Sequence, residues 1–272
     1  MAYERRTMRR RDFLKRSLFA GGAAAVGSIS VPASGSVLGA SDRIGIGIIG
    51  CGGMGLHHIG VYKALSEDRA VNIRLVGVCD IYEPRKQRAA AASGAQVYHD
   101  YRKLLERKDL DGVLIATPDH WHAKMAIDAM EAGKDVHVEK PMTLHLDEAR
   151  QMVEVAHRTR RVVQVGAEGT SRDVYWQARK VISEGGLGKI VWATGGVYRN
   201  EPTGDWNWPV DRDCSPRNLD WDAFVGPAPK RPFDPERYFR YRKYWDYSGG
   251  LAHDLIAHVL SALQLAIGFE FP

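Results

Sequence analysis

The sequence predicts an α/β protein whose first part is an open, doubly wound parallel sheet. Two observations predict this fold class. Short apolar runs rich in Ile and Val alternate with helix-compatible stretches between residues 44 and 166, which is the pattern of βαβ units. Glycines 50, 52 and 55 follow the first apolar run directly, where such a fold turns from a strand into a helix.

The elements of this sheet follow in order along the chain. Six runs are predicted as strands: Ile44–Ile49, Ile73–Cys79, Gln96–Tyr98, Gly112–Ala116, Asp135–Val138 and Val162–Val165. The clearest helix-compatible stretches are Tyr101–Arg107, His122–Ala132 and Leu146–Arg158. Strands that alternate with helices in this way fold as a parallel sheet with helices on both faces.

The pattern changes after Gly166. One predicted helix, Arg172–Ser183, is followed by a β-prone run, Lys189–Tyr198. A long stretch dense in Pro, Trp, Tyr and Arg then continues to Tyr247. We therefore predict two domains in series, a nucleotide-binding domain at 41–166 and an α+β domain at 167–272.

Residues 1–40 have the features of an export signal. A basic start contains Arg10-Arg11-Asp12-Phe13-Leu14-Lys15, and an apolar stretch of small residues, Leu18–Val31, follows it. This order is typical of a twin-arginine leader, so we expect the export machinery as a partner and a periplasmic or extracellular location. A retained membrane anchor is the alternative, but the stretch is shorter than the roughly 20 apolar residues that a span needs.

The excess positive charge of the chain lies in this leader. The sequence has 38 Lys and Arg against 33 Asp and Glu, and residues 1–40 hold seven basic and two acidic residues. The remaining chain is therefore formally neutral and gives no reason to expect nucleic acid as a partner. Three cysteines, Cys51, Cys79 and Cys214, make no disulfide framework, and the first two are interpreted as small buried hydrophobic residues.

The stretch Gly50-Cys51-Gly52-Gly53-Met54-Gly55 predicts a Rossmann-type dinucleotide site. Gly50 permits a tight turn, Gly52 lets the backbone approach the pyrophosphate, and Gly55 lets the helix pack closely on the strand. The phosphates would lie at the helix N-terminus, with Gly53 and Met54 completing the cofactor loop. A glycine turn without function is the alternative interpretation.

Asp80 predicts which nucleotide binds. It follows the second predicted strand, where a carboxylate can accept both ribose hydroxyls and would repel a 2′-phosphate, which favours NAD. Arg85 lies close downstream and could pair with a 2′-phosphate, so NADP is the alternative. Without a cofactor, Asp80 would be an exposed loop residue. Because nicotinamide nucleotides are scarce outside the cytoplasm, we expect a tightly held cofactor that is reoxidised in its own site.

Two further motifs lie where predicted strands end. Glu139-Lys140-Pro141 ends the strand at 135–138, and Thr117-Pro118-Asp119-His120-Trp121-His122, with Ala126 beyond it, follows the fourth strand. Together with the glycine motif they resemble the glucose-fructose oxidoreductase, inositol dehydrogenase and rhizopine catabolism (Gfo/Idh/MocA) family, from about Arg43 to the last residue.

This resemblance implies roles for individual residues. Thr117, Pro118 and His122 correspond to the wall of the nucleotide site, and Glu139 and Lys140 lie beside the cofactor. Lys140 is implied as catalytic, because oxidation of an alcohol requires removal of the hydroxyl proton as hydride leaves, and a lysine can orient that oxygen or relay its proton. A lysine at a strand end would otherwise be interpreted as merely solvated.

The second half of the site is predicted at Asp254 and His258. They are four residues apart in a helical pattern and therefore share one face. The resemblance implies that His258 transfers the proton and that Asp254 contacts the substrate. A pair bonded to nearby backbone is the alternative. His253, His120 and His122 could suggest a metal, but no cluster has a specific coordination spacing, and we predict none.

The resemblance also sets expectations for the rest of the chain. Family members continue into an open antiparallel sheet, whereas this sequence stops after the predicted catalytic helix, so we expect the α+β domain to be truncated and the run Lys189–Tyr198 to have too few partner strands. An oligomer of the full-length protein is left open. Aromatic and arginine residues before Tyr247 are interpreted either as a sugar-stacking face or as packing of a long loop.

These features predict an NAD(P)-dependent oxidoreductase that acts on a hydroxyl-bearing carbon of a sugar, cyclitol or glycoside. An NAD-dependent glycoside hydrolase or lyase is the alternative, in which oxidation is transient and elimination cleaves the bond. A non-catalytic nucleotide-binding protein is the third hypothesis.

Overall fold

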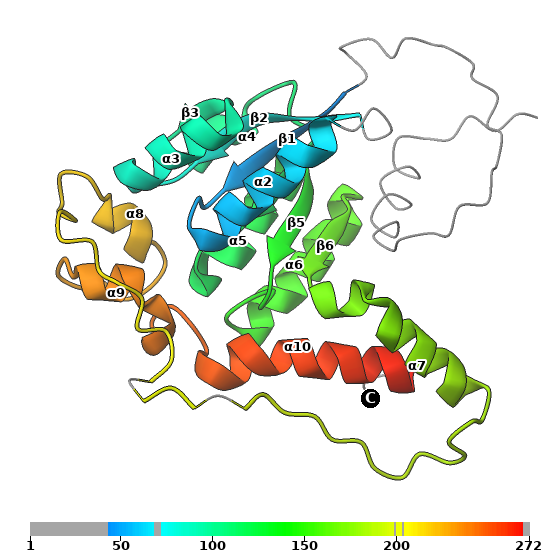
Figure 1. The fold of residues 1–272 in the computed structure, drawn as a ribbon. Helices are drawn as coiled ribbons and strands as arrows, with labels where there is room; N and C mark the ends of the chain where they lie inside the picture. Colours follow the sequence, from blue (N-terminus) through cyan, green and yellow to red (C-terminus); the bar gives the residue numbers. More distant parts are fainter. Residues whose placement is uncertain (1–42, 68–71, 199, 203, 269–272) are drawn as a thin grey trace, which may run out of the picture. The chain divides into compact units, whose positions relative to one another are not determined.

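The computed structural model describes residues 43–67, 72–198, 200–202 and 204–268. Its centre is a six-stranded sheet in the order β3-β2-β1-β4-β5-β6, in which every neighbouring pair is parallel (Figure 1). The strands are β1 Ile44–Ile49, β2 Ile73–Cys79, β3 Gln96–Tyr98, β4 Gly112–Ile115, β5 Asp135–Glu139 and β6 Val163–Gly166. The six predicted strands and the doubly wound fold class are confirmed.

Helices cover both faces of the sheet because alternate strand residues point to opposite sides. On one face Ile48, Val78 and Leu114 form a core with α2 (Gly53–Glu67) and α3 (Glu83–Ser93). On the other face, strand residues such as Ile115 and Val138 pack with three further helices. These helices are α4 Tyr101–Leu105, α5 Asp119–Glu131 and α6 Leu146–Thr159.

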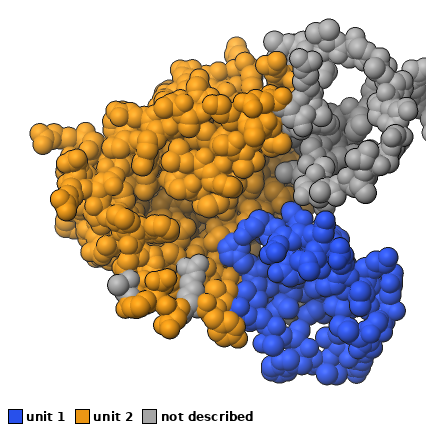
Figure 2. Space-filling model, in the orientation of Figure 1, with its two compact units in different colours: residues 1–35, 167–196, 258–272 blue, residues 36–166, 197–257 orange. Residues whose placement is uncertain are grey.

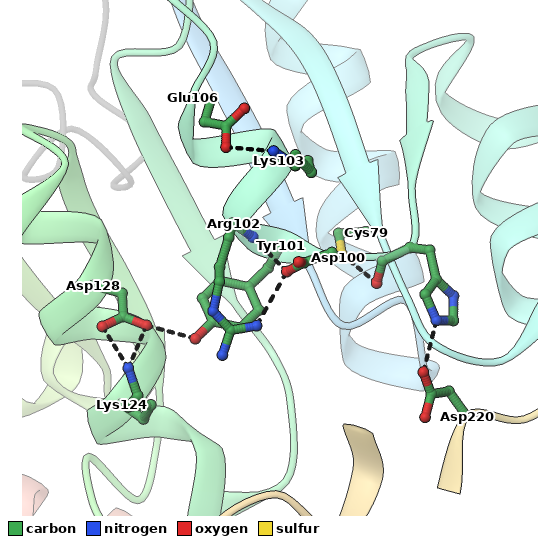
Figure 3. A network of polar contacts seen from close by, with 10 residues as sticks. Cys79, Asp100, Tyr101, Arg102, Lys103, Glu106, Lys124, Asp128 and Asp220 are labelled. Atoms are coloured by element: carbon green, nitrogen blue, oxygen red, sulfur yellow. Dashed lines mark hydrogen bonds and ion pairs between the residues drawn. The ribbon is translucent and has the colours of Figure 1, made fainter. Parts of the chain in front are cut away.

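Polar contacts join two of these helices (Figure 3). The Tyr101 hydroxyl of α4 donates to Asp128 of α5 at 2.6 Å, and Lys124 donates to the same carboxylate at 2.7 Å. The Nε2 of His99 lies 2.9 Å from the carboxylate of Asp220, a residue more than a hundred positions later in the chain. The second contact ties the end of β3 to the later part of the protein.

After Gly166 the regular elements of the described chain are helices, separated by a long irregular stretch between residues 184 and 220. The helices are η2 Glu168–Ser171, α7 Asp173–Ser183, α8 Trp221–Val225, α9 Pro235–Phe239, η3 Tyr241–Lys243 and α10 Gly250–Ile267. The chain divides into two compact units (Figure 2). One unit contains the sheet and residues 197–257, and the other contains residues 167–196 and the residues from 258 onward. The predicted serial division at Gly166 stays a prediction.

The β-prone run Lys189–Tyr198 forms no strand, and the expectation that it has too few partner strands holds for the described residues. Its side chains are mostly exposed, with Trp192 at 82% and Tyr198 at 95%. A strand needs a neighbour to pair with its backbone, and no segment within the described ranges supplies one. For the same reason, the expected antiparallel sheet is absent from the part of the chain that the structure describes.

The aromatic stretch before Tyr247 packs on the end of β2. Tyr82 forms an antiparallel bridge with Leu219, and its ring lies in a buried cluster with Phe224, Tyr238 and Tyr247. Backbone N–H groups of Glu83 and Asp220 complete the junction. Of the two interpretations of these aromatic residues, packing of a long loop therefore holds for this cluster.

The predicted export signal and its alternative, a retained membrane anchor, both concern residues 1–40. The export signal at 1–40 lies outside the described residues. Among the residues that are described, α10 is long and apolar enough to cross a membrane by length and composition, a test that core helices of soluble proteins also pass.

Candidate active site

The glycine turn has the geometry that a nucleotide diphosphate requires. Gly50 has φ of 88°, and a Cβ on it would lie 2.6 Å from the Ala116 carbonyl oxygen. A Cβ on Gly55 would lie 1.9 Å from the Gly50 oxygen. Nothing lies within 4 Å of the corresponding position on Gly53, the first residue of α2. This open space in front of a helix N-terminus suits a phosphate group, which the backbone N–H groups would bind.

Asp80 is buried beside this turn. Its Oδ2 accepts the Cys51 backbone N–H at 2.7 Å, and its Oδ1 accepts the N–H of Tyr82 at 2.8 Å. Each carboxylate oxygen keeps a lone pair for a further donor, so the geometry suits a ribose hydroxyl. The structure thus gives Asp80 a second task, which is to hold the glycine turn against the end of β2.

Arg85 lies between the glycine turn and the aromatic cluster. Its guanidinium is 4.7 Å from the centre of the Tyr238 ring and 5.5 Å from that of Phe239. One of its nitrogens is 3.4 Å from where a Cβ on Gly52 would lie. Stacking on two rings fixes the cation next to the predicted nucleotide edge.

His122 braces the wall of the predicted site. Its Nδ1 lies 2.7 Å from the Pro141 carbonyl oxygen and its Nε2 lies 2.8 Å from that of Thr117, so the ring joins the turns after β4 and β5. The Thr117 hydroxyl is buried and has no hydrogen-bond partner in the described chain. A buried donor without a partner suits a ligand contact. Nucleotide contacts of Thr117, Pro118 and His122 stay predictions.

Glu139 connects β5 to α2, the helix that follows the glycine turn. Its Oε1 lies 2.6 Å from Nε2 of His58 on α2, and its Oε2 accepts the Lys140 backbone N–H at 3.2 Å. Burial alone would raise the pKa of Glu139, but the His58 hydrogen bond and nearby charge lower it below its ordinary value. The carboxylate is therefore ionised and fixed, with its position set by α2.

Lys140 and Asp254, two of the predicted site residues, lie in direct contact. The Lys140 ammonium donates to Asp254 Oδ1 at 2.8 Å and to the Asp254 carbonyl oxygen at 3.1 Å. Arg242 Nε donates to the same Oδ1 at 3.4 Å. Burial would raise the pKa of Asp254, but the charge of Arg242 and the Lys140 hydrogen bond lower it. Two cations thus share one buried carboxylate, which leaves positive charge for a substrate oxygen.

His258 has a different partner. It lies on α10 one turn after Asp254, and its Nδ1 is 3.3 Å from the Glu168 carboxylate, within the unit formed by 167–196 and the residues from 258 onward. The predicted role of His258 in proton transfer stays a prediction.

Sequence reasoning missed several residues of the site. Arg242 and Tyr241 come from η3, Asp119 from the start of α5, and His253 from α10. Burial raises the pKa of Tyr241; the charge of Arg242 opposes this increase, and the charges of Asp119 and Asp254 add to it. Asp119 and His253 were visible in the predicted motifs, but no spacing rule connected them. No group of three or more His, Cys, Asp or Glu that could hold a metal occurs within the described residues.

The fold and the residues at the carboxyl ends of the strands define a class of protein. It is a dinucleotide-binding α/β domain with a largely buried lysine–aspartate pair near the strand ends. Two family models match the chain. The oxidoreductase family model with the NAD-binding Rossmann fold matches residues 44–167, and the model of the family's C-terminal alpha/beta domain matches 175–270. The chain belongs to the Gfo/Idh/MocA oxidoreductase family, and its first domain has an NAD-binding Rossmann fold.

Known proteins of two kinds resemble the chain. A glycosyl hydrolase family 109 protein of a Shewanella species is 37% identical over 130 residues, which cover 44% of this chain and 27% of the relative. An inositol 2-dehydrogenase of Rubrobacter xylanophilus is 33% identical over 154 residues, which cover 56% of this chain and 43% of the relative. The chain therefore spans less than half the length of these two relatives.

A solved structure agrees with the fold. The crystal structure of an NAD binding oxidoreductase from Klebsiella pneumoniae superposes with a TM-score of 0.59 at 26% identity. The match covers 83% of this chain and 53% of that chain.

Proposed function

We propose that the protein is an NAD-dependent oxidoreductase that acts on a hydroxyl-bearing carbon of a sugar, cyclitol or glycoside. The observation that carries the proposal is the contact between Lys140 and Asp254. It lies at the carboxyl end of β5, the edge of a parallel sheet where ligands bind. The similarity to an inositol 2-dehydrogenase supports the substrate class.

The residues of this edge divide the chemistry between them. NAD, bound along the glycine turn with Asp80 at its ribose, would supply the hydride acceptor. Lys140 orients the hydroxyl oxygen of the substrate, and its charge together with that of Arg242 stabilises the oxygen as its proton leaves. Asp254 holds both cations in place, because its buried carboxylate accepts from each of them.

A tightly held cofactor is part of the proposal. Residues 211–247 cover the end of β2, and Arg85 is clamped between that segment and the glycine turn. A nucleotide bound there leaves only when this cover moves. We propose with it that the leader directs export of the folded protein by the twin-arginine route. Replacing Arg10 and Arg11 by Lys should keep the protein in the cytoplasm, as fractionation of cells would measure.

A second function, cleavage of a glycoside, has specific support. The similarity to glycosyl hydrolase family 109 proteins favours it, and the tightly held cofactor that we propose would suit such a reaction. Oxidation of one ring carbon to a ketone would acidify the neighbouring C–H bond. Loss of that proton would expel the glycosidic oxygen as an alcohol and leave a double bond, water would add across that double bond, and return of the hydride to the ketone would restore the cofactor. The same Lys140 edge would serve both reactions.

One purification tests these proposals. The full-length protein is prepared without added cofactor and denatured, and the released nucleotide is identified by mass. The native protein is also incubated with myo-inositol and with 4-nitrophenyl glycosides. Stoichiometric NAD with alcohol oxidation supports the first function, and stoichiometric NAD with release of 4-nitrophenol supports the second. Protein that binds no nicotinamide nucleotide would contradict both.

A further inference from the structure

Trp245 differs from the aromatic residues around it because its side chain is not packed inside the protein. It is 80% exposed, whereas Tyr247, two residues later, is completely buried. The aromatic cluster that covers the end of β2 does not include Trp245. Because a single exposed apolar residue is common on protein surfaces, what distinguishes Trp245 is how its turn is held and where its ring lies.

The turn that carries Trp245 is held on both sides of this residue. The backbone N–H of Tyr247 donates to the Tyr244 carbonyl oxygen at 3.0 Å. The Asp246 carboxylate lies 3.0 Å from a guanidinium nitrogen of Arg237, and the same guanidinium lies 4.3 Å from the centre of the Tyr244 ring. The neighbours of Trp245 are thus fixed by the fold, and the turn presents one ring to solvent.

The Trp245 ring lies at the start of the helix that carries Asp254. A Cβ on Gly250, the first residue of α10, would lie 3.4 Å from the Cη2 atom of Trp245, so the edge of the ring rests on this glycine. Asp254 comes one turn later, about 6 Å along the helix axis. Arg242, three residues before Trp245, donates to Asp254 at 3.4 Å. The segment 242–245 therefore contacts the first turn of α10 at both of its ends.

The polar groups of this segment complement a polyhydroxylated ring. Arg242 is bonded to Asp254 through Nε, and its two terminal nitrogens have no hydrogen-bond partner within the described chain. A second tryptophan, Trp208, is 58% exposed, and its carbonyl oxygen accepts from Arg240 Nε at 3.0 Å. Exposed indole rings beside unused planar donors suit a ligand that has an apolar C–H face and hydroxyl groups at its edge.

We propose that Trp245 is a stacking platform for the substrate, and that the substrate is a pyranoside or a cyclitol rather than an open-chain polyol. This inference rests on the proposed function and names the substrate class of the same site. A six-membered ring with mainly equatorial hydroxyls has an apolar C–H face, which the indole covers. The terminal nitrogens of Arg242 bind hydroxyls at the edge of that ring, and the reacting carbon lies toward Lys140 and Asp254.

The kinetic test uses the full-length protein with NAD and the probe that the wild type converts, which is myo-inositol or a 4-nitrophenyl glycoside. We expect Trp245→Ala to raise KM about 30-fold and to keep kcat within about threefold, because the lost contact holds the substrate equally before and during the reaction. Trp245→Phe keeps an aromatic face and should restore most of the affinity. Trp192→Ala is the matched control, since Trp192 is 82% exposed but belongs to the other compact unit, and it should leave KM unchanged.

A second measurement requires no turnover. N-bromosuccinimide oxidises exposed tryptophan rings, and mass spectrometry of the peptides follows Trp245 and Trp192 in the same sample. A saturating pyranoside or myo-inositol should slow the oxidation of Trp245 and leave that of Trp192 unchanged. Sorbitol carries as many hydroxyls as myo-inositol but has no ring face, so it should protect neither residue.

The outcomes separate failure of the platform from failure of the proposed function. If the wild type turns over, Trp245→Ala keeps the wild-type KM and no ring compound protects Trp245, the platform is wrong and the proposed function stands. If Trp245 resists oxidation in the unliganded protein, a second copy or another segment covers its ring, and the platform is also wrong. A wild type that converts none of the probes while ring compounds still protect Trp245 supports the binding site and contradicts the proposed reaction.

Discussion

Glu139 and Lys140 are neighbours in sequence, yet their side chains serve two different parts of the protein. Glu139 meets His58 on α2, within the nucleotide-binding half, whereas Lys140 meets Asp254, which lies 114 residues later on α10. Successive side chains at a strand end point in opposite directions, so one short motif reaches both. The comparison teaches that one residue of the motif contacts the helix of the glycine turn and the other contacts α10, where the proposed reacting half lies.

The two ion pairs also share a property. Asp254 is buried and Glu139 is partly buried, which would raise the pKa of each carboxylate, and in both cases hydrogen bonds and positive charge lower it instead. The two pairs therefore have similar chemistry and differ in the helix that each one joins to the end of β5, which is α2 for Glu139 and α10 for Lys140. Substitutions on either side should separate effects on hydride transfer from effects on stability.

The largest expected effect is that of Lys140→Ala on catalysis. Hydride transfer should fall about 1,000-fold, because the group that orients the reacting oxygen is gone, while NAD still binds. The formation of NADH measures hydride transfer, and quenching of tryptophan fluorescence by NAD measures nucleotide binding. An equal loss of nucleotide binding would contradict the division between Glu139 and Lys140.

The second effect is that of Asp254→Ala on stability. Removal of this carboxylate leaves Lys140 and Arg242 close together without their shared acceptor, which should lower the free energy of unfolding by about 3 kcal/mol. Urea denaturation followed by circular dichroism measures it. Asp254→Asn keeps the shape and serves as the matched variant, and a loss below about 0.5 kcal/mol for Asp254→Ala would show that the pair is not formed.

A smaller effect is expected from Glu139→Gln, at about 1.5 kcal/mol of unfolding free energy. Because the pKa of Glu139 is lowered from 4.5 by folding, its charge stabilises the protein above pH 4.5, and this contribution is lost as the pH falls through the lower folded value. The variant should therefore lose less stability than the wild type between pH 4.5 and more acidic values. NAD affinity should fall more than kcat; the reverse order would transfer the catalytic role to Glu139.

The smallest effect serves as a control. Lys124 and Asp128 form a similar contact at 2.7 Å on the surface of α5, with the lysine half exposed (Figure 3). Lys124→Ala should change the unfolding free energy by less than about 0.5 kcal/mol, because solvent screens an exposed pair. A larger loss in the same urea experiment would mean that burial does not explain the difference between the surface pair and the Lys140 pair.

Much of the nucleotide-binding half could be predicted because its signals are local. The strands follow from apolar periodicity, and the glycine turn follows from steric rules at Gly50 and Gly55. The run Lys189–Tyr198 shows the limit of such signals, since its residues favour a strand but the described chain offers no partner. A high β propensity in one segment does not give a strand unless a second segment is present to pair with it.

Residues of the candidate site could be predicted only where they belong to a recognisable sequence motif. Lys140 and Asp254 belong to such motifs, and the structure brings them together. Arg242 and Asp119 reach the same place through the packing of η3 and α5, which leaves no regular spacing in the sequence. Tertiary contacts of this kind are set by the fold as a whole, and composition near Arg242 suggested only a sugar-stacking face or a packed loop.

The bridge between Tyr82 and Leu219 has a consequence for recombination between relatives. The Tyr82 ring is 1% exposed because residues from beyond position 210 lie on it, so the nucleotide half does not carry its own lid. A chimera that exchanges only residues 43–166 would put another protein's residue in place of Tyr82, beneath a segment whose aromatic side chains pack on Tyr82 in this chain. A functional exchange of cofactor preference must therefore transplant two separate pieces of sequence, the sheet and the segment 211–247.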